Sequence, residues 1–169
     1  MTSIRVVFVA MLMALSSLAV GQEPSKKQTS SKNDDRAALE KTLWDVEQHW
    51  LCISGPYALP YQDCVQFRSK FWVEQFFEIS AMGKVENKSE MVARQTAAHP
   101  APGVGPYPSD FKLQAVYGNI AMATDTTAFK TVDASGHLAF TSQTRVLRVF
   151  VKENGAWRPA AAALVPLSQ

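Results

Sequence analysis

Two apolar runs on either side of Asn154-Gly155 constrain the fold of this 169-residue chain more than any other feature. Residues 144–152 and 156–165 are rich in Val, Leu, Phe and Ala. Asn-Gly is the pair that most readily takes the positive-φ positions of a type I′ turn, so the two runs predict a β-hairpin. The two-residue loop sets Arg148 opposite Ala161. Both faces of the ribbon are mostly apolar, so we expect helices, another sheet or a second subunit to cover each of them.

A second hairpin is predicted upstream, where Gly118-Asn119 separates strands over 111–117 and 120–130. Its register places Lys112 opposite Asp125, which indicates a solvated cross-strand ion pair rather than a catalytic carboxylate. A third long strand over 138–152 then leads into the hairpin around Asn154-Gly155. The C-terminal half therefore reads as a four-stranded antiparallel meander.

The N-terminal half shows helical patterns interrupted by a short strand pair. Leu39, Leu43, Val46, Trp50 and Ile53 recur at steps of three and four, which predicts an amphipathic helix. Further helices are expected over 63–72 and, after the capping-box-like Asn87-Lys-Ser-Glu90, through about Ala98. We expect an α+β, cone-shaped fold, with three N-terminal helices packed on a curved, mainly antiparallel sheet.

The first residues have the pattern of a secretory signal. Arg5 precedes an apolar stretch over 6–18, and the small residues Ala19-Val20-Gly21 follow it. We expect residues 1–21 to be a cleaved signal peptide, 22–33 a flexible leader and 34–169 a single domain, secreted or periplasmic. The alternative is a retained membrane anchor, although this stretch is short for about 30 Å of hydrocarbon.

Charge and composition exclude some classes of partner. The chain is 47% hydrophobic and 19% charged, which suits one globular domain with a core. Its formal net charge of +2 falls to +1 when Arg5 is removed with the signal. This near-neutral body argues against nucleic acid as a partner, and against a membrane once the signal is cleaved.

Cys52 and Cys64 are the only cysteines. In an oxidising compartment an isolated pair forms a disulfide by default, and its short loop would contribute up to about 3 kcal/mol. A metal site and a reactive thiol are the alternatives. Neither has support, because no histidine or second cysteine pair stands at ligand spacing. We therefore expect no metal and no cofactor.

The chain has, in order, the opening amphipathic helix, the segments 77–90 and 116–124, and Arg145–Lys152 with Gly155 and Trp157. The order and spacing of these features give the chain, from about Asp35 to Val165, a resemblance to the SnoaL-like branch of the nuclear transport factor two-like (NTF2-like) superfamily, close to domain of unknown function 4440. It implies a cone-shaped fold with a pocket, and frequent homodimerisation through the sheet. Because this pocket serves isomerases, cyclases, dehydratases and non-catalytic binding domains, the fold does not decide the function.

Three positions that are often polar in such relatives are apolar here. They are Leu147, Ala163 and Val165. Their loss weakens any proton-transfer mechanism that used them and suggests a more apolar cavity. The expected pocket is lined by Trp50, Phe76, Tyr117, Arg145, Leu147, Trp157 and Ala163.

The candidate catalytic residues are Asp63 and Tyr61, which stand where some enzymes of this superfamily carry a helix-borne acid; both also suit a helix terminus. Arg145 and Arg148 lie in an otherwise apolar strand, so each must leave by the sheet edge, pair with an acid, or meet a ligand. The expected function is binding of a small apolar or amphipathic molecule, more in keeping with a binding protein than with an enzyme. The alternatives are an isomerase- or cyclase-type enzyme with acid–base residues in the pocket, and a non-catalytic dimeric interaction module.

Overall fold

The computed structural model describes residues 26–52, 57–98, 100 and 103–167. Its helices are α1 (Lys26–Leu51), α2 (Tyr61–Phe71) and α3 (Lys88–Ala97). Its strands are β1 (Phe77–Ile79), β2 (Val85–Asn87), β3 (Gly105–Tyr117), β4 (Ile120–Val132), β5 (Leu138–Glu153) and β6 (Ala156–Pro166). The α+β class is therefore confirmed. Only α1 and α2 precede the first strands, because α3 follows the β1–β2 pair.

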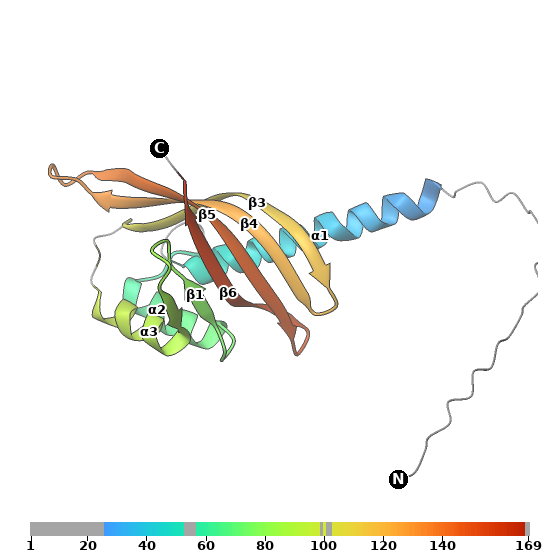
Figure 1. The fold of residues 1–169 in the computed structure, drawn as a ribbon, viewed down its shortest axis with the longest axis horizontal. Helices are drawn as coiled ribbons and strands as arrows, with labels where there is room; N and C mark the ends of the chain where they lie inside the picture. Colours follow the sequence, from blue (N-terminus) through green and yellow to red (C-terminus); the bar gives the residue numbers. More distant parts are fainter. Residues whose placement is uncertain (1–25, 53–56, 99, 101–102, 168–169) are drawn as a thin grey trace, which may run out of the picture.

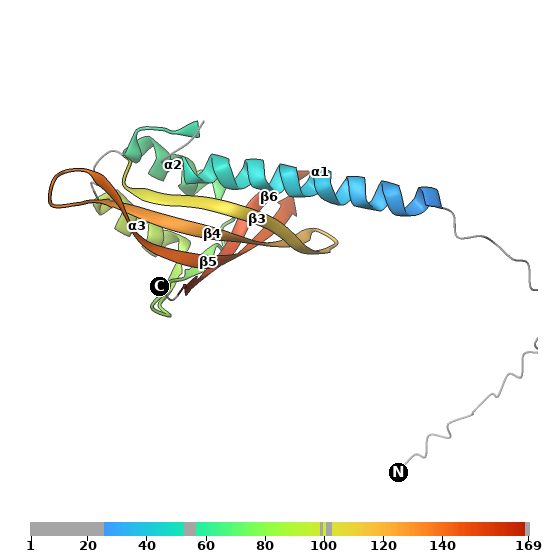
Figure 2. The same ribbon diagram turned by 90° about the horizontal axis from the view of Figure 1, so that it is seen from above.

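All six strands form one sheet in the order β2-β1-β6-β5-β4-β3. Every neighbouring pair is antiparallel except β1 and β6, which run parallel. The long strands curve, and the three helices gather on one side of them, with α1 running alongside β3 (Figures 1 and 2). No helix of the described residues covers the opposite face of the sheet (Figure 2).

Helix α1 is longer at its N-terminus than the sequence pattern suggests. It begins at Lys26, inside the segment 22–33 that was expected to be a flexible leader. Neither Gly nor Pro occurs between Lys26 and Leu51, so nothing stops the helix from extending outward from its packed part. The projecting end of α1 reaches well beyond the sheet (Figure 1). The expected signal peptide, residues 1–21, lies outside the described residues.

The hairpin around Asn154-Gly155 is confirmed, with positive φ at both residues. Its register agrees with the expectation as far as Phe150 opposite Pro159, and then shifts by one, so that Arg148 faces Ala162 instead of Ala161. The cause is a β-bulge between Val149 and Phe150, which puts one extra residue in β6. A bulge exchanges the two faces of a strand beyond it.

A bulge also makes the register of β3 and β4 differ from the expected one. The pairing changes between Leu113 and Ala115, so Lys112 faces Thr124 rather than Asp125. Asp125 is fully buried. The predicted solvated pair of Lys112 with Asp125 is therefore wrong, and Asp125 faces the helices.

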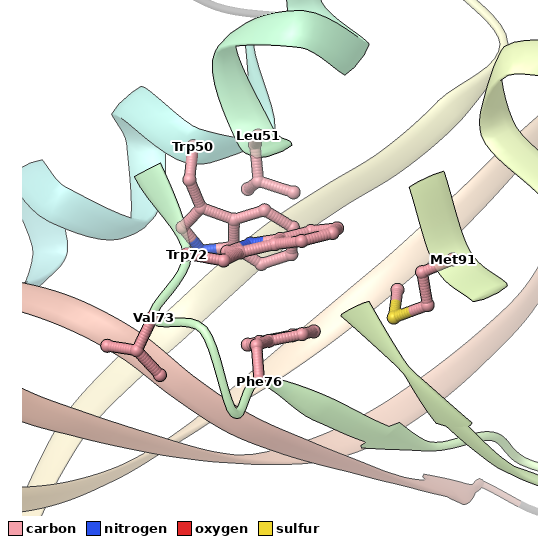
Figure 3. Close-up of a cluster of buried hydrophobic side chains, with 6 residues drawn as sticks. All are labelled: Trp50, Leu51, Trp72, Val73, Phe76 and Met91. Carbon is pink, nitrogen blue, oxygen red and sulfur yellow. The ribbon is translucent and has the colours of Figure 1, made fainter. Parts of the chain in front are cut away.

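The helices bury their apolar side chains in two clusters. One cluster comprises Trp50, Leu51, Trp72, Val73, Phe76 and Met91 (Figure 3). In it, Trp72 stacks on Phe76 at 4.3 Å between ring centroids, and Trp50 meets Trp72 edge-on at 5.7 Å. The other cluster joins α1 to the strands through Leu43, Leu113, Ala121, Ala123 and Phe150.

The predicted Cys52–Cys64 disulfide is present, with the two Cα atoms 5.5 Å apart. Cys52 directly follows α1, and Cys64 lies in the first turn of α2. The bond thus fixes the end of α1 against the first turn of α2.

Candidate functional site

A cavity of about 280 Å³ lies between the inner face of the long strands and the helices. Its apolar lining includes Trp50, Leu51, Met91, Val104, Phe129, Val146 and Leu164. Its polar lining comprises Tyr61, Arg68, Glu78, Arg94, Gln95, Thr127 and Arg148. An apolar wall with a few converging polar groups is the usual composition of a small-molecule site.

Arg148, at the inner face of β5, is held by two carboxylates from other elements. Its Nε donates to Asp125 Oδ2 at 2.8 Å, and its Nη2 lies 2.9 Å from Glu47 Oε1 on α1. Glu47 and Asp125 are fully buried, and Arg148 is 5% exposed. The sequence left three possibilities for Arg148, and the structure gives an ion pair with acids while also placing its side chain at the cavity wall.

Two neighbours complete this cluster. Thr127 donates from Oγ1 to Asp125 Oδ1 at 2.5 Å, and Trp50 donates from Nε1 to Glu47 Oε2 at 2.5 Å. The Arg148 guanidinium carbon also lies 5.2 Å from the centre of the Trp50 ring. The cluster therefore positions one ring and one hydroxyl of the cavity wall.

Burial and the neighbouring charges shift the pKa values of Glu47 and Arg148. Burial raises the pKa of Glu47 to about 7, against the opposing effect of Arg148. Burial lowers the pKa of Arg148, but the charges of Glu47 and Asp125 outweigh it and leave that pKa raised. One guanidinium thus faces two buried carboxyl groups, and the raised pKa of Glu47 lets that carboxyl group keep its proton up to a pH of about 7.

Arg68, on α2, is a second buried guanidinium at the cavity. Its donors reach the carbonyl oxygens of Trp50 at 2.8 Å and Leu51 at 2.5 Å, and Gln95 Oε1 at 3.2 Å. The carbonyl contacts cap the last turn of α1. Burial lowers the pKa of Arg68 to about 10, and the effects of Tyr61, Glu47 and Glu78 only partly oppose this shift.

Glu78, on β1, is the acidic side chain that lines the cavity. Directly opposite it on β2 is Glu86, whose oxygens pair with Lys84 at 3.0 Å and Arg94 at 2.9 Å. Burial raises the pKa of Glu78, and the arginines Arg148 and Arg94 only partly oppose the shift. The hydrogen bonds from Lys84 and Arg94 lower the pKa of Glu86 instead. Glu86 therefore pairs with both cations, while Glu78 lines the cavity without a close cation.

The structure brings together few of the residues predicted for the pocket. Trp50 lines the cavity, and so does Tyr61, one of the two predicted catalytic residues. Asp63, the other, is exposed and does not line it. The pair proposed from the sequence is therefore divided between the inside and the outside of α2.

The remaining predicted pocket residues lie elsewhere. Phe76 is in the aromatic cluster (Figure 3), Trp157 packs against the cluster around Leu43, and Tyr117 is 68% exposed. Arg145, Leu147 and Ala163 do not line the cavity, because Val146, Arg148 and Leu164 alternate with them and face it. Strand alternation places Arg145 and Leu147 on the uncovered side of the sheet, and the β6 bulge moves Ala163 to the same side.

The sequence pattern did not indicate that five residues line the cavity, namely Arg68, Glu78, Arg94, Gln95 and Thr127. A signal for Arg68 was present, since Val65 and Trp72, one turn to either side of it, are apolar and buried. Glu78 gave no comparable signal, because a three-residue strand is too short for alternation to show.

Neither a metal site nor a membrane span is found in the described residues. No group of three or more His, Cys, Asp or Glu side chains there could hold a metal ion. No helix in that part of the chain is long and apolar enough to cross a membrane.

The fold, in contrast to the sequence, has many counterparts. No family model and no curated protein matches the chain, so assignment to domain of unknown function 4440 stays a prediction. Among solved structures, the association domain of C. elegans CaMKII is similar with a TM-score of 0.64 and 16% identity, over 78% of this chain and 98% of that one.

Two bacterial structures are similar to a comparable degree. An NTF2-like protein with a cystatin-like fold from Novosphingobium aromaticivorans has a TM-score of 0.61 and 14% identity, over 88% of this chain and 93% of that one. An NTF2-like protein of unknown function in nutrient uptake from Rhodospirillum rubrum has a TM-score of 0.53 and 14% identity, over 78% and 98%. Identities this low establish the fold alone.

Proposed function

Since the chain has the NTF2-like fold, we propose that its cavity binds a small amphipathic molecule, with the apolar part against the wall and the polar part at the charged end. The observation that carries this proposal is the composition of the cavity. Trp50, Met91 and Leu164 offer apolar contact, while Arg68, Glu78 and Arg148 offer charged groups. A volume of about 280 Å³ suits a ligand with a single ring or a short chain.

A binding role is favoured over a catalytic one by the positions of the acids. Glu47 has the pKa suited to proton transfer near neutrality, but it is fully buried and does not line the cavity. Asp63 is on the outside of α2. An isomerase- or cyclase-type activity would therefore have to use Glu78, whose raised pKa is the one observation in its favour, with Tyr61 as a second group.

We also propose that the protein works outside the cytoplasm. The N-terminal residues have the pattern of a cleaved signal peptide. The Cys52–Cys64 disulfide is compatible with an oxidising compartment.

A homodimer through the sheet is the third part of the proposal. The face of the sheet away from the helices carries a cross-strand row of Val85, Ile79, Ala163 and Leu147. Nearby, Phe77 is 41% exposed and Val165 is 60% exposed. An apolar surface of this kind on a soluble domain commonly meets another protein surface, and a second copy would cover it by twofold symmetry.

The binding function is tested with 3-phenylpropan-1-ol, a neutral amphipathic probe with one ring, by isothermal titration calorimetry on the disulfide-bonded protein. We expect saturable binding that Leu164→Trp abolishes by filling the cavity. Val165→Trp is the matched control, because the next side chain of β6 points to the other face and should leave binding unchanged. Equal binding by both variants would place the probe outside the cavity and contradict the proposal.

A further inference from the structure

Two charged side chains at the cavity lack a close partner of opposite charge. Among the described residues, no carboxylate oxygen lies within 4.0 Å of Arg68, and no cationic nitrogen lies within 4.0 Å of Glu78. Arg68 is 3% exposed. A buried charge is costly unless a partner compensates it. Both groups line the cavity, where a ligand could supply that partner.

The protein's own groups leave this pair unmatched for separate reasons. Arg68 donates three of its five N–H groups to two carbonyl oxygens and an amide oxygen, none of which carries a charge. Glu78 stands across from Glu86, which already binds Lys84 and Arg94. Arg68 and Glu78 influence each other electrostatically, but they do not approach within ion-pair distance.

The other charged groups at the cavity are matched. Arg148 has Asp125 and Glu47, and Arg94 has Glu86. The unmatched charge is therefore one cation and one anion. A ligand with a single negative charge would be attracted by Arg68 but repelled by Glu78. A ligand with a single positive charge would be attracted by Glu78 but repelled by Arg68.

We propose, building on the binding function proposed above, that the ligand is a zwitterion with an apolar side, such as an apolar α-amino acid. Its carboxylate pairs with the Arg68 guanidinium, and its ammonium group donates to the Glu78 carboxylate. The apolar part lies against Trp50, Met91 and Leu164. Both unmatched groups then gain a partner, and the occupied cavity keeps its overall charge balance.

Four probes with a phenylpropyl body separate this proposal from simple apolar binding. They are 3-phenylpropan-1-ol (neutral), 3-phenylpropanoate (anionic), 3-phenylpropylamine (cationic at pH 7) and L-phenylalanine (zwitterionic), each titrated calorimetrically at pH 7. Since a hydrogen bond to a charged group is worth about 1.5–3 kcal/mol, phenylalanine should bind roughly tenfold or more tightly than either singly charged probe.

The Glu78→Gln variant gives a second readout that does not depend on absolute affinity. It keeps the size of the side chain and removes its charge, so the preference for phenylalanine over 3-phenylpropanoate should fall to about parity or reverse. Glu74→Gln is the matched control. Glu74 is exposed, pairs with Lys88 and does not line the cavity, so its variant should keep the wild-type preference.

The outcomes distinguish this inference from the function on which it rests. If the four probes bind equally and Leu164→Trp abolishes them all, the cavity binds apolar bodies, the zwitterion proposal is wrong, and Arg68 only caps α1. If 3-phenylpropanoate or 3-phenylpropylamine binds most tightly, the zwitterion proposal is wrong as well, although the cavity still binds ligands. If none of the four probes binds, both proposals fail.

Discussion

Arg148 and Asp125 form an ion pair of 2.8 Å across two adjacent strands, at a point where Asp125 has no contact with solvent. Glu47 joins the same guanidinium from α1. Asp125 and Arg148 lie on consecutive strands, whereas Glu47 lies on α1, far from both in the sequence, so the cluster fixes the helix against the sheet beside the cavity. The intact cluster is expected to add little to the free energy of unfolding, whereas removal of one partner should lower it strongly, because the remaining buried charge is left unpaired.

Arg148→Met should therefore be strongly destabilising. It leaves two buried carboxyl groups without their cation, and the free energy of unfolding should fall by about 3–5 kcal/mol in urea or guanidinium titrations. Arg145→Met is the control, because Arg145 is an exposed neighbour on the opposite face, and its loss should change stability by no more than about 0.5 kcal/mol. Similar losses in the two variants would contradict the structural role of the Arg148 cluster.

The pKa of Glu47 predicts how stability depends on pH. Its folded-state pKa is about 7, against 4.5 for an ordinary glutamate, so between these values the folded state holds a proton that the unfolded state releases. The contribution of Glu47 to the free energy of unfolding must then fall as the pH rises from 4.5 to 7, by at most about 1.4 kcal/mol for each pH unit, and level off above.

Glu47→Gln should remove this slope, because glutamine does not titrate. The measurement is the free energy of unfolding of variant and wild type at several pH values between 4.5 and 8. Asp45→Asn, at an exposed site two residues earlier on α1, should keep the wild-type slope. Parallel curves for wild type and Glu47→Gln would show that Glu47 ionises normally in the folded protein.

The sequence predicted local features well because they depend on neighbouring residues. Asn154-Gly155 takes the turn that its residue types favour, and the Asn87–Glu90 capping box begins α3. The stripe from Leu39 to Trp50 forms a helix that packs on the sheet. The disulfide could be predicted because only two cysteines are present.

The site was harder to predict, since it depends on which face of its strand each side chain occupies and on contacts between residues that are distant in the sequence. One extra residue in β6 moves Ala163 to the uncovered face and brings Leu164 to the cavity. A bulge in β3 likewise moves Lys112 to the face away from Asp125, and Asp125 pairs with Arg148 instead. The β3 shift at Gln114 has no glycine or proline beside it, whereas the β6 shift directly follows Pro159, a residue type that is found at bulges. Strict alternation from the turns ignored both shifts and gave the wrong face.

Replacing both cysteines should lower the free energy of unfolding, because the disulfide holds the end of α1 against α2. Cys52→Ala with Cys64→Ala opens a short loop, and the chain-entropy estimate gives a loss of about 3 kcal/mol in the free energy of unfolding. Reduction of the wild-type protein should cause a comparable loss, whereas the double variant should not respond to the reductant. A double variant as stable as the oxidised protein would show that packing alone holds α1 against α2.

Charge introduced on the uncovered sheet face should separate the proposed dimer. Phe77→Lys with Val165→Lys places two cations on a surface that would have to be buried against its symmetry mate, and a buried like-charge contact disfavours association. Light scattering after size-exclusion chromatography should give a dimer for the wild type and a monomer for this variant.

Val132→Lys is the matched control for the dimer test. Val132 is exposed to a similar extent as Phe77, at 40%, and lies near the end of β4, away from the row formed by Val85, Ile79, Ala163 and Leu147. A wild-type monomer at micromolar concentration, or a dimer that survives both lysines, would mean that this face is not the contact. Because the cavity lies within one chain, the monomeric variant should still bind 3-phenylpropan-1-ol, which separates assembly from ligand binding.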